Sequence, residues 1–362
     1  MSIENEFWRG KRVLVTGHTG FMGGWLTVVL KEAGAKVSGY ALAPPTEPSF
    51  FDSVGLSRLL DGDARGDIRD RMMFSEVLRE QAPEIVFHLA AQPLVRQAFR
   101  EPVETFDVNI MGTVSVLEAA REVPGIRGLV VVTSDKVYDN REWEWDYREN
   151  DRLGGREPYG VSKACAELVV EAYRQSFFAA RNVGVATVRA GNIIGGGDWA
   201  AERLVPDIVR AFSSGVALIV RNPSATRPWQ HVLEPLRGFL ALAEALTLDP
   251  SRFAGAWNFG PAREDHKPVS WVVDYCARLW GEDAVWKTEG DARSPYEALR
   301  LGLSCSKAEL RLGWTPRWRI ETALGHTLDW YRAMRGGGDM LEETRAQVRA
   351  AFCGAAKELQ LQ

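Results

Sequence analysis

Residues 12–23 read RVLVTGHTGFMG, a short apolar stretch followed by a glycine-rich turn. The turn has the pattern G-x-x-G-x-x-G from Gly17 to Gly23, between a first expected strand (Arg12–Thr16) and a first expected helix (Phe21–Ala33). Glycine allows the backbone to approach a pyrophosphate closely, and a helix N-terminus offers free N–H groups to that anion. The arrangement therefore predicts a dinucleotide site near the start of the chain.

Strand and helix patterns alternate through the rest of the N-terminal half. Short apolar strands are expected at Lys36–Leu42, Ile85–Ala90, Gly128–Thr133 and Val183–Arg189, and helices at Arg69–Gln81, Pro102–Glu122 and Tyr159–Ala180. Such continuously apolar strands are buried on both faces. The pattern predicts an α/β fold, a Rossmann-type doubly wound parallel sheet, in which ligands bind beyond the carboxyl ends of the strands.

The pattern changes after about residue 190, where loops rich in Gly, Pro, Arg and Trp separate shorter helices. These helices are expected at Val232–Leu246, Pro268–Trp280 and Ile320–Met334. We therefore expect residues 1–190, joined by about 228–256, to form the dinucleotide-binding domain, and residues 191–362 to form mainly a smaller C-terminal substrate-binding domain.

Composition excludes several classes of protein. The chain has 362 residues, 46% of them hydrophobic, and a formal net charge of −4, so a disordered chain and an electrostatic nucleic-acid binder are not expected. Its apolar segments are too short for a membrane helix. The four cysteines form no C-x-x-C pair and predict no metal site, and a reducing, cytoplasmic setting fits them best.

A second motif, Y-x-x-x-K, pairs Tyr159 with Lys163 at the start of an expected helix. Residues four apart share a helix face, and an ammonium near a phenol favours the phenolate that a general base requires. The motif is common by chance, but here Ser134, Asp135 and Lys136 follow the preceding strand. Together these side chains predict an active site.

Several segments together resemble the extended short-chain dehydrogenases/reductases that modify nucleotide sugars. They are TGHTGFMGGWL, GDIRD, HLAAQ, NIMGT, TSDKVY, YGVSK and RAGNIIGGGDW. Within that family, GYALAPPTEPSFF, TSDKVYDNREWEWDYREND, NPSATRPWQHVLEP and SCSKAELRLGW are similar to segments of CDP-hexose 4,6-dehydratases. The resemblance implies NAD as cofactor, a nucleotide-sugar substrate, a homodimer and a redox-neutral loss of water.

The resemblance also implies a role for each catalytic residue. Tyr159 would take the proton of the sugar 4-hydroxyl, Ser134 would hydrogen-bond that hydroxyl, and Lys163 would hold the nicotinamide ribose. Asp135 would protonate the departing 6-hydroxyl, and Lys136 would remove the C5 proton.

Further residues are implied as binding residues. Besides Tyr159 and Lys163, the cofactor residues would be Gly17, Thr19, Gly20, Phe21, Met22, Gly23, Asp67, Ile68, Leu89, Ala90, Ala91 and Asn109. The substrate residues would be Asn192, Arg203, Arg227 and Arg293.

Some assignments stay open at this level. The end of the second strand carries neither the acid typical of NAD sites nor an arginine for NADP, and Asp67 could instead be a helix N-cap. Lys136 needs desolvation or a nearby cation, such as Lys163, to act as a base. Asp135 and Lys136 can share a site only where regular strand geometry has ended.

The chain departs from the usual family pattern at four positions. It has Met22, Ala43, Tyr296 and Ser304 where Lys, Asp, His and Asp are usual. A dehydratase for another nucleotide hexose, a C4-epimerase or a catalytically silent homologue therefore stay alternatives.

Overall fold

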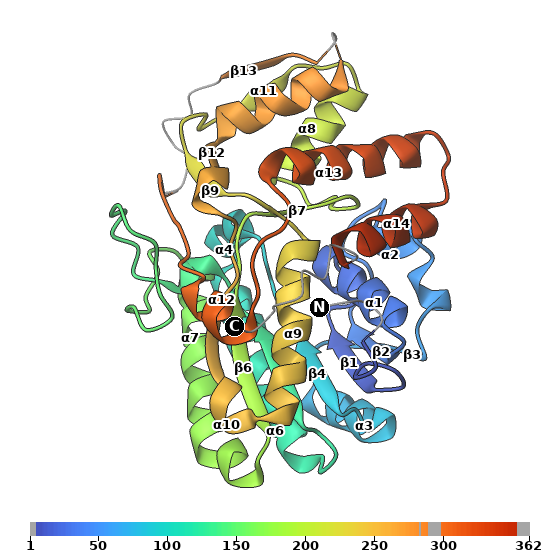
Figure 1. The fold of residues 1–362 in the computed structure, drawn as a ribbon, viewed down its shortest axis with the longest axis vertical. Coiled ribbons are helices and arrows are strands. Elements are labelled where there is room, and N and C mark those ends of the chain that lie inside the picture. Colours follow the sequence, from blue (N-terminus) through green and yellow to red (C-terminus); the bar gives the residue numbers. More distant parts are fainter. Residues whose placement is uncertain (1–4, 282–283, 289–297, 353–362) are drawn as a thin grey trace, which may run out of the picture.

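A computed structural model describes residues 5–281, 284–288 and 298–352. Its centre is a parallel seven-stranded sheet with the strand order β11-β6-β5-β4-β1-β2-β3 (Figure 1). The strands are β1 (Arg12–Thr16), β2 (Lys36–Ala41), β3 (Gly62–Arg65), β4 (Ile85–His88), β5 (Gly128–Val132), β6 (Gly184–Arg189) and β11 (Gly255–Asn258). The expected Rossmann-type doubly wound sheet is confirmed.

The chain changes direction across the sheet between β1 and β4. Val13 of β1 pairs with Val37 of β2 on one side and with Ile85 of β4 on the other. The chain runs outward through β2 and β3, then returns to continue from β4 toward β11. A crevice forms at such a switch point beyond the carboxyl ends of the strands, here beside Thr16 and His88.

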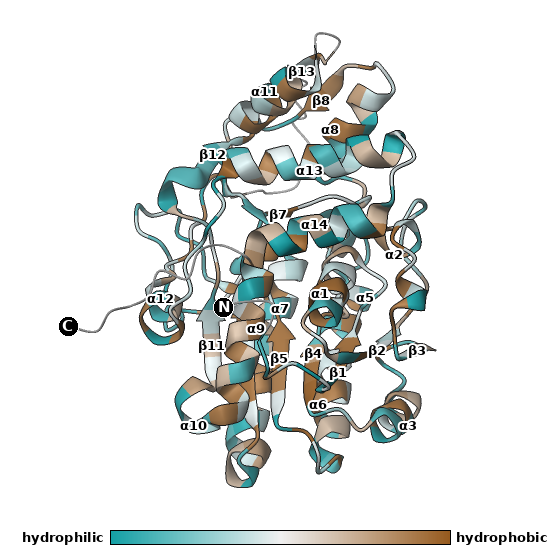
Figure 2. Ribbon diagram, turned by 45° about the vertical axis from the view of Figure 1, so that its right-hand side comes forward, coloured by the Kyte–Doolittle hydropathy of each residue, from teal (hydrophilic) through white to brown (hydrophobic). Residues whose placement is uncertain are grey.

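Alternating side chains of β1 face two separate hydrophobic clusters. Val13 and Val15 belong to the cluster that includes residues of α1 (Phe21–Glu32) and α9 (Leu233–Leu248), whereas Leu14 belongs to the cluster with α3 (Arg71–Gln81) and α6 (Gly112–Glu122). The central strands are coloured mainly as hydrophobic in Figure 2. The sheet is thus covered on both faces, as its continuous apolar strands require.

Two long expected helices contain irregular turns. The helix expected over 102–122 is divided into α5 (Pro102–Phe106), a π-helical turn (Asp107–Met111) and α6. The helix expected from Tyr159 begins as α7 (Pro158–Tyr173) and continues through a second π-helical turn (Arg174–Phe178). Such turns insert one residue and redirect the side chains beside them.

The C-terminal elements lie mostly beyond the carboxyl edge of the sheet (Figure 1). They include the helices α8 (Leu204–Ser213), α11 (Val269–Trp280), α12 (Ser306–Leu312), α13 (Ile320–Arg335) and α14 (Met340–Phe352). They also include short strands that pair two by two: β7 (Ile193–Ile194) and β10 (Gln230–His231), β8 (Leu218–Val220) and β13 (Trp286–Thr288), and β9 (Thr226–Pro228) and β12 (His266–Pro268). The remaining short helices are α2 (Phe50–Ser53), α4 (Val95–Arg100) and α10 (Pro250–Phe253). Across the described ranges, every helix is too short or too polar to span a membrane.

Candidate active site

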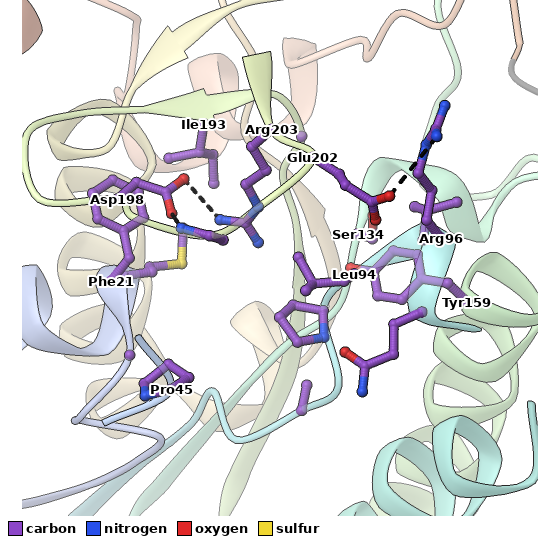
Figure 3. A pocket seen from close by; sticks show the side chains of 18 of the residues that line it. Phe21, Pro45, Leu94, Arg96, Ser134, Tyr159, Ile193, Asp198, Glu202 and Arg203 are labelled. Carbon is purple, nitrogen blue, oxygen red and sulfur yellow. Dashed lines mark hydrogen bonds and ion pairs between the residues drawn. The ribbon is translucent and has the colours of Figure 1, made fainter. Parts of the chain in front are cut away.

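A cavity of about 1120 Å³ opens at the carboxyl edge of the sheet, between the strand ends and the C-terminal elements. Figure 3 shows Ser134, Tyr159, Asp198 and Arg203 around it. The lining includes nearly all the predicted site residues, from the glycine turn, the ends of β4 and β5, the start of α7 and the loops after β6. Asn109 does not line it, and Arg293 lies outside the described residues.

The glycine turn forms a cradle that fits a dinucleotide pyrophosphate. Gly17 has a φ of +75°, and a Cβ there would lie 2.7 Å from the backbone nitrogen of Ala90. A Cβ on Gly23 would lie 2.2 Å from the carbonyl oxygen of Gly17. Gly20 precedes α1, which has neither a capping side chain nor an acidic residue in its first turn. The N-terminus of α1 is therefore available for an anion.

The charged side chains near the end of β2 belong to the neighbouring strand β3. Asp63 and Arg65 of β3 pair with Gly39 and Ala41 of β2 in the sheet register. The Asp63 carboxylate contacts both the imidazole of His18 (2.9 Å) and Arg65 (2.8 Å). These charged groups cannot be found among the residues that directly follow β2 in the sequence, because they belong to β3, which the sheet places beside β2.

Asp67 and Asn109 have clear local partners. The Asp67 carboxylate accepts hydrogen bonds from Arg69 at 2.6–3.0 Å, and the N-cap of α3 is Asp70, so the N-cap alternative for Asp67 is wrong. Asn109 lies in the π-helical turn after α5, where its amide bonds the backbone of Gln92 and the hydroxyl of Ser162 (2.8–3.1 Å). Asn109 thus joins the loop after β4 to α7, beside the cavity wall.

The loop that carries the predicted catalytic residues Ser134, Asp135 and Lys136 begins where regular strand geometry stops. β5 ends at Val132, and Asp135–Val137 form a single 3-10 turn. Ser134 caps this turn: its hydroxyl accepts the backbone N–H of Lys136 (3.2 Å) and donates to Oδ1 of Asp135 (3.1 Å). The turn allows Asp135 and Lys136 to line the same cavity, as the sequence required.

Asp135 is buried with one oxygen uncommitted. Its exposed fraction is 2%, and Oδ2 has no hydrogen-bond partner within the described part of the chain. A Cβ on Gly191 would lie only 2.0 Å from that oxygen, so a larger residue there would displace the carboxyl group. A buried polar atom without a partner is costly and often marks a functional group.

Tyr159 and Lys163 occupy the first two turns of α7. Burial raises the pKa of Tyr159 to about 12, while the Ser134 hydroxyl and the Arg203 guanidinium act to lower it. Burial also lowers the pKa of Lys163 to about 8, and its Nζ donates to the Val132 carbonyl (3.1 Å). Lys163 is therefore anchored to the end of β5, directly before the loop that carries the predicted catalytic residues.

Glu157 is a cavity-lining carboxylate that the sequence reading missed. It is the N-cap of α7, and its oxygens accept the backbone N–H groups of Tyr159 and Gly160, both at 2.7 Å. Burial raises the pKa of Glu157 above its ordinary value, and the backbone N–H groups of Gly160 and Tyr159, together with the nearby Lys136, offset only part of that rise. Proline at the first helical position, here Pro158, is a typical helix-start signal, and that signal could have located the preceding Glu157.

The C-terminal side contributes arginines from separate elements. Arg203 pairs with Asp198 at 2.9 Å (Figure 3), and Arg227 donates to the carbonyl of Thr226 (2.9 Å). Asn192 lines the cavity as predicted. Planar guanidinium groups suit the oxygens of a diphosphate.

An ion pair joins two segments of the cavity lining, α4 and the loop before α8. Glu202, which has a φ of +63°, lies 3.8 Å from Arg96 of α4 (Figure 3). Its carboxylate also lies 3.3 Å from Arg100 at the end of the same helix. Glu202 and Arg96 both line the cavity. This contact between the two halves of the chain had no signal in the sequence.

The four residues that depart from the family pattern lie in different parts of the molecule. Met22 and Ala43 line the cavity, Ser304 does not, and Tyr296 lies outside the described residues. His88 is fully desolvated, and burial lowers its pKa to about 3, so it is a neutral structural residue near pH 7.

Comparisons with known proteins agree with this geometry. The family model described as "NAD dependent epimerase/dehydratase family" matches residues 13–258. The chain is 52% identical over 351 residues to a CDP-glucose 4,6-dehydratase of Salmonella typhimurium, covering 96% of this chain and 97% of the relative. It is 24% identical over 344 residues to a dTDP-glucose 4,6-dehydratase of Xanthomonas campestris, covering 88% and 92%.

Solved structures share the fold. A UDP-glucose-4-epimerase from Stenotrophomonas maltophila with bound NAD and formylated UDP-arabinopyranose has a TM-score of 0.78 at 22% identity, covering 91% of this chain and 100% of that one. A dTDP-glucose 4,6-dehydratase from Bacillus anthracis in complex with NAD has a TM-score of 0.74 at 22% identity, covering 92% and 100%.

Proposed function

The chain belongs to the NAD dependent epimerase/dehydratase family, and from that membership we propose that it converts CDP-D-glucose to CDP-4-keto-6-deoxy-D-glucose and water. The observation that carries the proposal is the buried Asp135, whose free oxygen lies in the same cavity as Tyr159 and Lys136. Oxidation and reduction at C4 alone need only the tyrosine. Loss of water needs an additional acid and base.

Bound NAD would supply a hydride acceptor for oxidation at C4 of the hexose and a hydride donor for reduction at C6. Tyr159 takes the proton of the 4-hydroxyl, with Ser134 and Arg203 countering the effect of burial on its pKa. The free oxygen of Asp135 protonates the departing 6-hydroxyl, and Lys136 takes the C5 proton, which is acidic beside the C4 ketone. Lys163, anchored at the Val132 carbonyl, holds the nicotinamide ribose.

The predicted binding residues lie on two sides of the cavity, one for the cofactor and one for the nucleotide sugar. The cradle from Gly17 to Gly23 takes the NAD pyrophosphate, and the other predicted cofactor residues surround it. Arg203, Arg227 and Asn192 contact the nucleotide sugar, consistent with their place in the lining. We assign NAD binding to residues 1–190 with the returning segment 228–256, and substrate binding mainly to the remainder.

We further propose a homodimer that works in the cytoplasm. Large apolar side chains are exposed along α5, its π-helical turn and α7, with Val103 at 80%, Met111 at 51% and Leu168 at 60%. An apolar face on adjoining helices suits burial against a second copy. Cys165, Cys276 and Cys305 are free thiols, which fits a reducing compartment.

The direct test is a mass measurement on four nucleotide sugars. The protein is incubated with NAD and, separately, CDP-glucose, dTDP-glucose, UDP-glucose and GDP-mannose. We expect loss of one water from CDP-glucose. Loss from another donor would reject the proposed substrate, and isomerisation without water loss would indicate an epimerase.

Two variants test the proposed acid and base. Asp135→Asn and Lys136→Met should block water loss while leaving oxidation at C4 detectable as bound reduced cofactor. Normal product formation by both variants would reject the assignment.

A further inference from the structure

A buried ion pair joins α7 to the end of β6. Arg189 donates to both carboxylate oxygens of Glu167, at 2.9 Å from Nε and 2.8 Å from Nη2. The exposed fractions of the two side chains are only 3% and 4%. Neither residue belongs to the cavity lining, so neither is placed to contact cofactor or substrate. The proposed dehydration chemistry therefore gives this pair no role.

The pair is hydrogen-bonded to both residues that flank the loop of residues 134–137. On one side of the loop, the Thr133 hydroxyl donates to Oε1 of Glu167 at 2.5 Å. On the other side, Nη1 of Arg189 donates to the Tyr138 hydroxyl at 2.8 Å. Thr133 and Tyr138 are themselves buried. The loop that carries the predicted catalytic residues is therefore held at both ends by one pair of charges.

The same pair fixes this loop relative to other parts of the site. Glu167 follows Lys163 by four residues on α7, and residues four apart share a helix face. Two residues after Arg189, Gly191 packs against the carboxyl group of Asp135, where a Cβ would lie 2.0 Å from Oδ2. The pair thus links the helix of Lys163 both to the loop and to the wall that confines Asp135.

Stability alone does not account for a charge pair at this place. Taking two charges out of water is costly, and apolar side chains of similar volume often stabilise a fold as well or better. The Glu167 carboxylate accepts four hydrogen bonds, from Thr133, from Thr187 at 2.6 Å and from two nitrogens of Arg189. A fully satisfied buried network of this kind makes the connected segments rigid and favours one arrangement of them.

We propose that Glu167 and Arg189 are positioning residues, which hold the loop of residues 134–137 at the place beside α7 that water loss requires. Asp135 and Lys136 then face the same sugar as Tyr159. Reaction rates are sensitive to such placement, since an error of about 1 Å can cost roughly 10²-fold. The inference rests on the proposed dehydratase function and adds to it two residues that lie outside the cavity lining.

The test compares two threonines that donate to the same carboxylate. Thr133→Val and Thr187→Val each remove one hydroxyl from Glu167, and both leave the ion pair in place. Only Thr133 adjoins the loop, whereas Thr187 lies within β6. We expect similar falls in the urea midpoint, but a kcat for dehydration roughly 10-fold lower in Thr133→Val than in Thr187→Val, with KM changed less than about twofold. Thr133→Ser keeps the hydroxyl and should restore kcat.

A second variant, Tyr138→Phe, tests the other end of the loop. It removes the hydroxyl that accepts from Nη1 of Arg189, so it should also lower kcat with little change in KM. Equal kcat values in Thr133→Val and Thr187→Val would overturn the proposal, because both variants disturb the same carboxylate. An unchanged kcat in Tyr138→Phe would overturn it as well.

Hydrogen exchange gives a readout that does not depend on activity. The backbone N–H of Lys136 donates to the Ser134 hydroxyl within the loop, so its exchange reports whether the loop is held. Without added cofactor or substrate, the peptide that contains residues 134–137 should exchange faster in Thr133→Val than in Thr187→Val, and equal exchange would reject the positioning role. If the wild type dehydrates none of the four sugars, the proposed function fails, whereas the exchange comparison still decides whether the pair holds the loop.

Discussion

The two ends of the cavity are built in different ways. At the cofactor end, the important features are backbone N–H groups and missing side chains: Gly17 and Gly23 leave no room for a Cβ. At the catalytic end, the proposed function depends on side chains such as Asp135, Tyr159 and Arg203, which line the cavity from three separate segments. The comparison teaches that a continuous backbone motif can hold a cofactor, whereas acid–base chemistry needs convergent side chains.

The largest expected effect comes from a substitution at the catalytic end of the cavity. Tyr159→Phe removes the proposed general base and should lower kcat roughly 10²–10⁴-fold. Most predicted cofactor residues lie on other segments, so the NAD dissociation constant should rise far less than kcat falls. Initial rates and a fluorescence titration with NAD measure the two quantities. An equal loss in both would show that the two ends are not independent.

The next largest effect comes from comparing alanine substitutions at two glycines of the cofactor end. Gly23→Ala places a Cβ 2.2 Å from the Gly17 carbonyl oxygen and should destabilise the protein by about 1–3 kcal/mol. Gly20→Ala is the matched control, because the nearest atom to its Cβ is 3.4 Å away. We expect Gly20→Ala to weaken NAD binding without lowering the stability of the free protein. Urea unfolding without cofactor distinguishes them, and equal stabilities would contradict the packing argument.

A pH effect tests the burial of Lys163, where the two ends meet. Burial lowers its pKa from an ordinary value of 10.5 to about 8. Between these values the unfolded chain binds more protons than the folded chain, so stability rises with pH. Relative to Lys163→Met, the wild type should gain up to about 3 kcal/mol of unfolding free energy from pH 8 to 10.5. Urea titrations across this range measure it. A constant difference would contradict the lowered pKa.

The smallest effect concerns the ion pair between Glu202 and α4. Glu202→Gln removes a partly exposed contact with Arg96 and Arg100, and exposed pairs contribute about 0.2–1 kcal/mol. We expect KM for the sugar nucleotide to change less than about fivefold, and the difference to vanish at high salt. Asp329→Asn removes an exposed pair with Arg332 and should leave KM unchanged. A salt-independent change would show that Glu202 acts on the substrate directly.

Local sequence located several parts of the site well. The glycine turn was readable because its residues are consecutive and must lie between β1 and α1. Glu157 was missed although the helix-start signal of Pro158 is local, because Glu157 lies outside the Y-x-x-x-K motif. Glu202 had no local signal, since its partners are about one hundred residues earlier in the chain.

The sequence by itself determined the sheet, the cradle and the types of reactive side chain, because apolar periodicity and short motifs act between neighbours in the chain. Only the tertiary structure decided which of those groups meet. It placed Asp135 and Lys136 beyond the end of β5, brought Arg203 toward Tyr159, and moved Asn109 out of the cavity lining. The physical reason is that burial, desolvation and hydrogen bonding depend on contacts between segments far apart in the chain.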